Sequence, residues 1–248
     1  MAKDQWKWSS TLGVYNPILQ LLFFFDIIIK DFLPRLKNHF LSHLLGLRYD
    51  GDELDFTPSD CHSIIFDNNI IYCHKVLHVN YTTYDMRQAQ DSLNPRVPGH
   101  GNIMVLSPEN EEKNNDPHPY WYACIIGIFH ANIHHIGPKS TSREPIQTRM
   151  DFLFVRWFGC DSDPQPGWKS RRLIQLGFVP GNDGSAFGFL DPNQVICGIH
   201  LIPAFHWGQV TKYLPWLPIA RENDNPDHDW QLFYIRMYVF LNYLLVTN

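Results

Sequence analysis

Hydrophobic residues along the chain change their spacing twice, and the first segment has helical spacing. Asn16 and Pro17 are typical of a helix start, and the apolar run that follows predicts a helix to about residue 31. Pro34 interrupts this helix, and large apolar residues recur around and after it at spacings of three and four: Leu33, Leu36, Phe40, Leu44 and Leu47. Residues 1–50 are therefore predicted to form a helical arm.

Between residue 51 and residue 205 the pattern changes to short β-branched and aromatic runs separated by Gly, Pro, Asn and Asp. Two such runs flank Asp67-Asn68, which predicts a hairpin, and the glycine-rich stretch 177–188 predicts a hairpin loop. Further strands are expected at 103–106, 121–135, 150–158, 173–179 and 194–202, with loops at 86–101 and 108–118. This pattern of short strands and turns favours a central antiparallel β-barrel or strongly bent sheet over alternating strands and helices.

The last part of the chain, residues 206–248, returns to helical spacing. A helix is predicted near 228–245, where five residues share one face: Trp230, Phe233, Met237, Leu241 and Leu244. We expect this segment to pack on the β-rich core, so that the whole chain forms one structural domain. The predicted fold class is α+β, with the central antiparallel sheet flanked by N-terminal and C-terminal helices.

The stretch HPYWYACIIGIFHANIHHIG (118–137) is the richest in aromatic residues and histidines. As a central strand it places Trp121, Ala123, Ile125, Gly127 and Phe129 on one side, and Tyr122, Cys124, Ile126 and Ile128 on the other. On a strand, His130 and His134 lie about 13 Å apart and cannot share a metal ion. We therefore predict no metal site, and no phosphate-binding or nucleophile motif indicates a cofactor.

Composition restricts the class of protein. The formal net charge of −5 and the scattered basic residues do not predict a dominant phosphate-binding surface. Five cysteines without a CxxC pair are typical of reduced thiols, which predicts an intracellular protein, nuclear or cytoplasmic. The apolar run 18–29 contains Asp26 and is too short for a transmembrane span, and it lacks the features of a signal peptide.

Several long phrases of the sequence resemble the C-terminal region of Plavaka-type transposon proteins, which belong to CACTA-like DNA elements of mushroom-forming fungi. The phrases occur in the same order and cover most of residues 32–236: FLPRLKNHFLSHLLGLRYDGDE (32–53), HKVLHVNYTTYDMRQAQDSLNPR (74–96), NIMVLSPE (102–109), HPYWYACIIGIFHANI (118–133), MDFLFVRWFGCD (150–161) and AFGFLDPNQVICGIHLIPAF (186–205). In such proteins the catalytic carboxylates belong to an upstream ribonuclease-H-like domain. The resemblance thus implies a transposon-derived chain that lacks this domain and its strand-transfer chemistry.

Two hypotheses for function follow. The first is a non-catalytic binding module that recognises nucleic acid or a chromatin peptide through aromatic and basic side chains: Trp121, Tyr122, Trp157, Trp168, Lys169, Arg171 and Arg172. The core is the competing interpretation for Trp121 and Trp157, which lie in apolar strands. The alternative is a recruited fungal enzyme that acts on a small apolar substrate in an aromatic-lined pocket, with acid–base candidates Tyr81, Tyr84, Asp85, His130, Arg156, His200 and His206. Under either hypothesis, the protein is expected to self-associate through its apolar helices.

Overall fold

The computed structural model describes residues 31–47, 54–82, 87–107, 119–136, 147–161, 173–211 and 229–236, and the backbone of 6–8 and 14–17. The helices in these ranges are α2 (Phe32–Leu44), α3 (Pro58–His62) and the 3-10 helices η1 (Pro192–Gln194) and η2 (Phe205–Trp207). The strands are β1 (Trp6–Trp8), β2 (Val14–Pro17), β3 (Ile64–His74), β4 (Leu77–Thr82), β5 (Gln88–Leu93), β6 (Asn102–Leu106), β7 (Tyr120–His135), β8 (Gln147–Asp161), β9 (Gln175–Phe178), β10 (Phe187–Leu190), β11 (Val195–Gly198), β12 (Leu201–Pro203), β13 (Gln209–Val210), β14 (Asp229–Trp230) and β15 (Phe233–Ile235).

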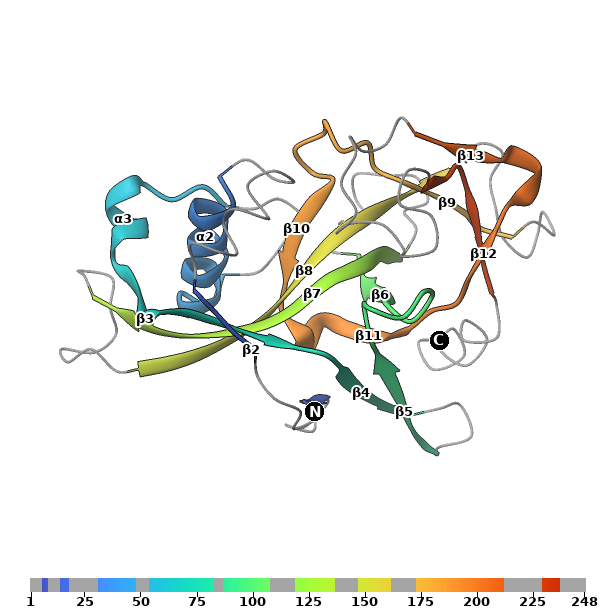
Figure 1. Ribbon diagram of the computed structural model, residues 1–248. Helices are drawn as coiled ribbons and strands as arrows, with labels where there is room; N and C mark the ends of the chain where they lie inside the picture. The colour runs from blue at the N-terminus through green and yellow to red at the C-terminus, as the bar shows by residue number, and fades with distance from the viewer. Residues whose placement is uncertain are drawn as a thin grey trace.

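The main sheet is antiparallel and is built around the long strands β7 and β8, which run side by side across the molecule (Figure 1). The outer edge of β7 is shared by β6 and β3, and the outer edge of β8 is shared by β9 and β10. The path through the sheet is β11-β6-β7-β8-β9-β15-β12. The sheet curls strongly into an open half-barrel, so the predicted bent sheet is confirmed and the closed barrel is wrong.

A β-bulge in β7 changes which residues share a face. Ile125 pairs with Val155 and Gly127 pairs with Phe154, so Ile126 is an extra residue on β7. Beyond the bulge, Ile128 packs in the same core cluster as Ile125, whereas Phe129 packs with the opposite face. The face assignment from strict alternation is therefore correct before residue 126 and wrong after it.

The hairpin predicted at Asp67-Asn68 is wrong, because both flanking runs pair with β7 in the same direction. Residues 64–66 pair with 133–135, and residues 71–74 pair with 128–131. The four residues between them form a protrusion from one strand, with Asn68 and Asn69 at φ angles of 52° and 53°. Asn tolerates this left-handed conformation better than most residues.

The loop between β9 and β10 is a second protrusion and not the predicted hairpin loop. Both strands pair with β8, β9 at residues 158–161 and β10 at residues 153–156. Trp157 bridges the gap, since its N–H donates to the Ala186 carbonyl and its carbonyl accepts from the Val179 N–H. The two strands are thus consecutive segments along one edge of β8.

Two small sheets lie beside the half-barrel. Strand β5 lies within the stretch 86–101 predicted to be a loop, and it forms the sheet β1-β4-β5. Strands β13 and β14 form a separate two-stranded ribbon. The helix predicted near 228–245 is wrong over residues 229–236, which form β14 and β15, and its remainder lies outside the described residues.

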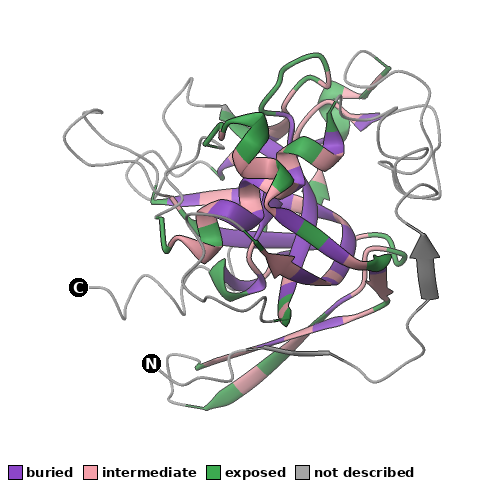
Figure 2. Cartoon of the chain, turned by 90° about the vertical axis from the view of Figure 1, so that its left-hand side faces the viewer, coloured by how far each residue is buried: buried purple, intermediate pink, exposed green. Residues whose placement is uncertain are grey.

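Helix α2 confirms the helical prediction for the segment after Pro34, and it covers one face of β3, β7, β8 and β10 (Figure 1). The helix predicted over 16–31 is wrong at residues 16 and 17, which belong to β2. Residues 18–30 lie outside the described part. The opposite face of the sheet packs on β4 and β5, and a third cluster lies among β9, β11 and β15. Burial is concentrated in these layers (Figure 2). None of the helices in the described ranges is long and apolar enough to cross a membrane.

Candidate functional site

An exposed aromatic turn follows β12, the strand at one end of the half-barrel's strand order. Strand β12 ends at Pro203, and η2 then carries Phe205, His206 and Trp207, which we call the aromatic turn. The N–H of Trp207 donates to the Ala204 carbonyl over 2.9 Å, which closes the turn. Gly208 follows with a φ angle of 73°, a conformation that glycine adopts without strain. The chain then enters β13.

The aromatic turn is the most exposed aromatic group in the described part of the chain. Phe205 is 69% exposed and Trp207 is 48% exposed, and Ile202 on the adjacent strand β12 is 45% exposed. Trp230 of β14 packs edge-on against Phe205, with ring centroids 5.1 Å apart and an interplanar angle of 86°. Apolar side chains grouped on a surface in this way are typical of interaction sites.

The surroundings of the aromatic turn carry no exposed carboxylate in the described stretches 200–211 and 229–236. The acidic residue in these stretches, Asp229, is 5% exposed and is paired with Arg156. His200, His206 and Arg236 are exposed, and the N–H of Arg236 donates to the His200 carbonyl. The described residues of these two stretches therefore expose no acidic side chain, although the whole chain has a formal charge of −5.

The pair of Arg156 and Asp229 is the most buried ionic feature of the described residues. Arg156 is 0% exposed, and its two terminal nitrogens each donate to one Asp229 oxygen over 3.0 Å. The guanidinium carbon lies 3.6 Å from the ring centroid of Phe178. Arg156 is thus engaged with a carboxylate and a ring, which does not suit it to the acid–base role considered from the sequence.

His130, another acid–base candidate, pairs with a histidine that sequence reasoning missed. The Nε2 atom of His74 and the Nδ1 atom of His130 lie 2.7 Å apart, and Tyr72 stacks on His130 with centroids 4.4 Å apart. Burial and the nearby charge of Arg149 lower the pKa of His74 to about 4 and that of His130 to about 3. Strand register places Tyr72, His130 and Asp151 in one row across β3, β7 and β8.

The remaining acid–base candidates do not converge on one site. The Tyr81 hydroxyl donates to Asp91, and burial together with the Asp91 charge raises the pKa of Tyr81 to about 12. His200 lies near His100, with ring centroids 6.5 Å apart, and His206 belongs to the aromatic turn. Tyr84 and Asp85 lie outside the described residues. The described candidates therefore belong to separate surroundings.

The aromatic residues chosen from the sequence as ligand contacts are mostly interior. Tyr122 is 0% exposed and Trp157 is 8% exposed, and Trp121 is half-buried against Trp157 with centroids 5.8 Å apart. This agrees with the core interpretation of Trp121 and Trp157. Four of the ligand candidates lie outside the described residues: Trp168, Lys169, Arg171 and Arg172. Sequence reasoning missed Phe205 and Trp207, whose signal was an aromatic pair between Pro203 and Gly208.

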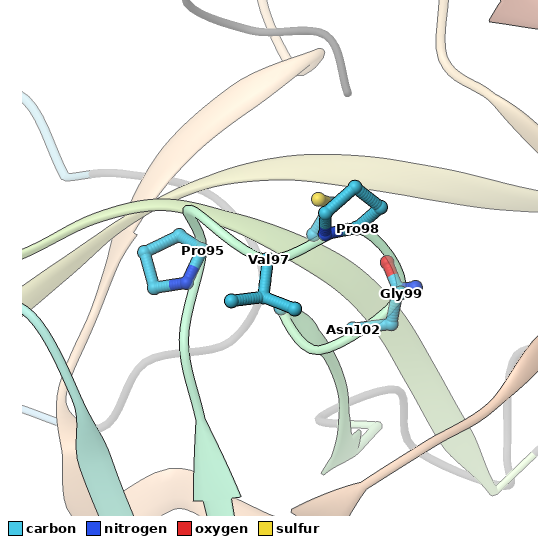
Figure 3. A pocket seen from close by; sticks show the side chains of 7 residues that line it. Pro95, Val97, Pro98, Gly99 and Asn102 are labelled. Atoms are coloured by element: carbon cyan, nitrogen blue, oxygen red, sulfur yellow. The ribbon is translucent and has the colours of Figure 1, made fainter. Parts of the chain in front are cut away.

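A small pocket lies apart from these features, beside β6. This pocket has a volume of about 20 Å³, and Figure 3 shows the seven residues that line it: Pro95, Val97, Pro98, Gly99, Gly101, Asn102 and Cys124. A space of this size holds about one water molecule. Among the described ranges, no three His, Cys, Asp or Glu side chains are grouped so as to hold a metal ion.

Comparison with protein-family models, curated proteins and solved structures gives no match to this chain. The resemblance to Plavaka-type transposon proteins therefore stays a prediction from the sequence. We therefore infer the function from the chemistry of the site itself.

Proposed function

We propose that the protein is a non-catalytic binding module, derived from a fungal transposon protein, that holds single-stranded nucleic acid on its aromatic turn. The observation that carries this proposal is the exposure of Phe205 and Trp207, at 69% and 48%, on a turn whose described neighbours in 200–211 and 229–236 expose no carboxylate. Proteins that bind single strands stack successive bases on aromatic side chains of this kind, largely independently of sequence. A nuclear or cytoplasmic location goes with this proposal.

The local charge favours nucleic acid over a chromatin peptide. A basic peptide tail would be attracted by carboxylates, and the described stretches 200–211 and 229–236 expose none. Phosphate groups would meet no repelling carboxylate from these described stretches. We therefore place the peptide second, as an outcome that the binding experiment distinguishes.

An enzyme acting on a small apolar substrate finds less support. Such enzymes enclose most of their substrate in a pocket of several hundred Å³. Here buried side chains fill both faces of the curled sheet, and the described acid–base candidates lie in separate surroundings. Hydrophobic packing of the described residues on both faces is what we expect of a recognition module.

Fluorescence anisotropy with a labelled oligothymidine tests the proposal. We expect Trp207→Ala and Phe205→Ala each to weaken binding by about 5- to 150-fold, because one stacked base contributes about 1–3 kcal/mol. Leu106→Ala is the matched control, since Leu106 is 64% exposed but belongs to β6. We expect this control to bind like the wild type.

Three results would contradict the proposal. The proposal is removed if the wild-type protein does not bind the oligonucleotide. It is also removed if the two aromatic variants bind the oligonucleotide as tightly as the wild type does. Binding of a methyllysine peptide that depends on Trp207 in place of the oligonucleotide would assign the turn to a chromatin peptide.

A further inference from the structure

The buried pair of Arg156 and Asp229 joins two segments that are far apart in the sequence. Arg156 lies on β8, at the centre of the half-barrel, and Asp229 begins β14, which pairs only with β13 among the described strands. Two parallel hydrogen bonds of 3.0 Å fix the carboxylate against the guanidinium. This fork geometry specifies both the distance and the orientation of the partner.

Stability alone does not account for an ionic pair at this position. The cost of removing both charges from water largely offsets their attraction, and apolar residues of similar volume stabilise such a site equally well or better. What the charged pair supplies and an apolar pair lacks is directional contact. The pair thus specifies where β14 sits on β8.

Strand β14 in turn contacts the aromatic turn through side chains and backbone. Trp230, the residue after Asp229, packs edge-on against Phe205. The ribbon register places Gln209 opposite Trp230 and Val210 opposite Asp229, and the N–H of Gln231 donates to the Gly208 carbonyl over 3.1 Å. A shift of Asp229 would therefore move the residues that flank the turn.

We infer that Arg156 and Asp229 are positioning residues, which hold the aromatic turn in its binding geometry by fixing β14 on the half-barrel. This inference rests on the proposed function of the turn. Neither residue touches the bound nucleic acid, because both side chains are buried. Their effect reaches the ligand through Trp230, which supports the Phe205 ring.

The double variant Arg156→Met with Asp229→Leu separates positioning from stability. It replaces the ionic pair by apolar side chains, so we expect cooperative unfolding at a denaturant midpoint near that of the wild type. Hydrogen exchange of the backbone amides in residues 205–211 should become about 10-fold faster, because directional support is lost. Binding of oligothymidine should weaken by about 10-fold, for the same reason.

Phe154→Leu is the matched control. Phe154 is buried on β8 two residues before Arg156, and it packs against Phe32 and Phe189 rather than against β14. We expect this variant to be less stable than the wild type but to keep wild-type exchange rates in residues 205–211. A general loosening of β8 would instead raise exchange in both variants.

The outcomes decide the inference separately from the proposed function. Wild-type exchange in residues 205–211 of the double variant would overturn it, and so would a double variant that fails to fold, because the pair would then be required by the fold itself. Faster exchange in the double variant, combined with a wild type that binds no nucleic acid, would support the positioning role and remove the proposed ligand.

Discussion

At the scale of single residues, the pair of His74 and His130 makes the protein sensitive to acid. Their nitrogen atoms, 2.7 Å apart, share one hydrogen bond, which requires at least one neutral ring. His39 adds a third imidazole of lowered pKa, about 3, because of burial and the nearby His43. All three side chains are therefore neutral in the folded protein at pH 7.

We predict that the protein loses stability as the pH falls below about 6.5, the ordinary pKa of histidine. Between that value and about 4, the unfolded chain binds protons that the folded chain does not, so lower pH favours unfolding. Urea unfolding at pH 7 and pH 5 should show a loss of roughly 1–2 kcal/mol, reduced by solvent screening of the half-buried pair. His130→Asn should flatten this dependence, whereas His100→Gln, at an exposed position, should not. Equal slopes in the two variants would contradict the assignment.

Gly127 gives a second prediction at this scale. A Cβ atom there would lie 2.3 and 2.4 Å from two ring carbons of Phe129, so Gly127→Ala must displace a buried ring. We expect a destabilisation of about 1–3 kcal/mol in urea unfolding. Gly184→Ala is the control, because an added Cβ there meets nothing within 4 Å, and it should change stability little. A Gly127→Ala variant as stable as this control would show that the bulge adapts without cost.

The residues of the candidate site were harder to predict than the core. Trp157 was correctly given a core interpretation because it lies in a continuous apolar strand, and the structure leaves it 8% exposed. Phe205 and Trp207 have no such context. An aromatic residue in a turn is buried or exposed according to what packs on the turn, and that depends on tertiary contacts which periodicity does not contain.

At the scale of elements, the long strands were predictable and the interruptions were not. β7 and β8 have dense β-branched and aromatic runs, and both appear near their predicted positions. The residues Asp67 and Asn68 have the composition of a hairpin turn, yet the chain continues along β7 after a protrusion of four residues. Local turn chemistry specifies a bend, whereas the strand that pairs next decides between hairpin and protrusion.

Short strands were likewise not predictable from local spacing and composition. Trp230 and Phe233 match a helical spacing with Met237, but Phe233 and Ile235 are buried on one side of a short strand. Strand β5 has the sequence QAQDSL, whose polar residues predicted a loop. It forms because β4 offers a free edge, and its buried residue is Leu93. Pairing with an existing edge overrides weak strand propensity.

Helix α2 provides a prediction for an element. Phe40 is 0% exposed and packs edge-on against Phe152 of β8, with ring centroids 5.4 Å apart. We expect Phe40→Ala to destabilise the protein by about 3–5 kcal/mol, because a buried ring is replaced by a cavity. Differential scanning calorimetry measures the loss, with Leu47→Ala at the exposed end of the segment as the control. A loss below about 1 kcal/mol would mean that α2 contributes little to the core.

At the scale of the whole molecule, the long strands of the half-barrel are buried, and the exposed aromatic turn lies at the end of its strand order. Helix α2 covers one face near one end of the sheet, and the small sheet of β4 and β5 packs on the other face (Figure 1). The path through the main sheet ends at β12, and the aromatic turn directly follows this strand. The fold thus places an exposed aromatic group beside an edge strand of the half-barrel, an arrangement that suits the proposed recognition role.

Photo-crosslinking shows directly whether bound nucleic acid contacts the aromatic turn. An oligonucleotide containing 5-iodouracil is irradiated in complex with the full chain, and the attached peptide is identified by mass spectrometry. Because stacked aromatic rings lie in contact with the base, the account predicts attachment at Phe205, His206 or Trp207, and its loss in a Phe205→Ala, Trp207→Ala double variant. Attachment confined to another surface, or no attachment at all, would contradict it.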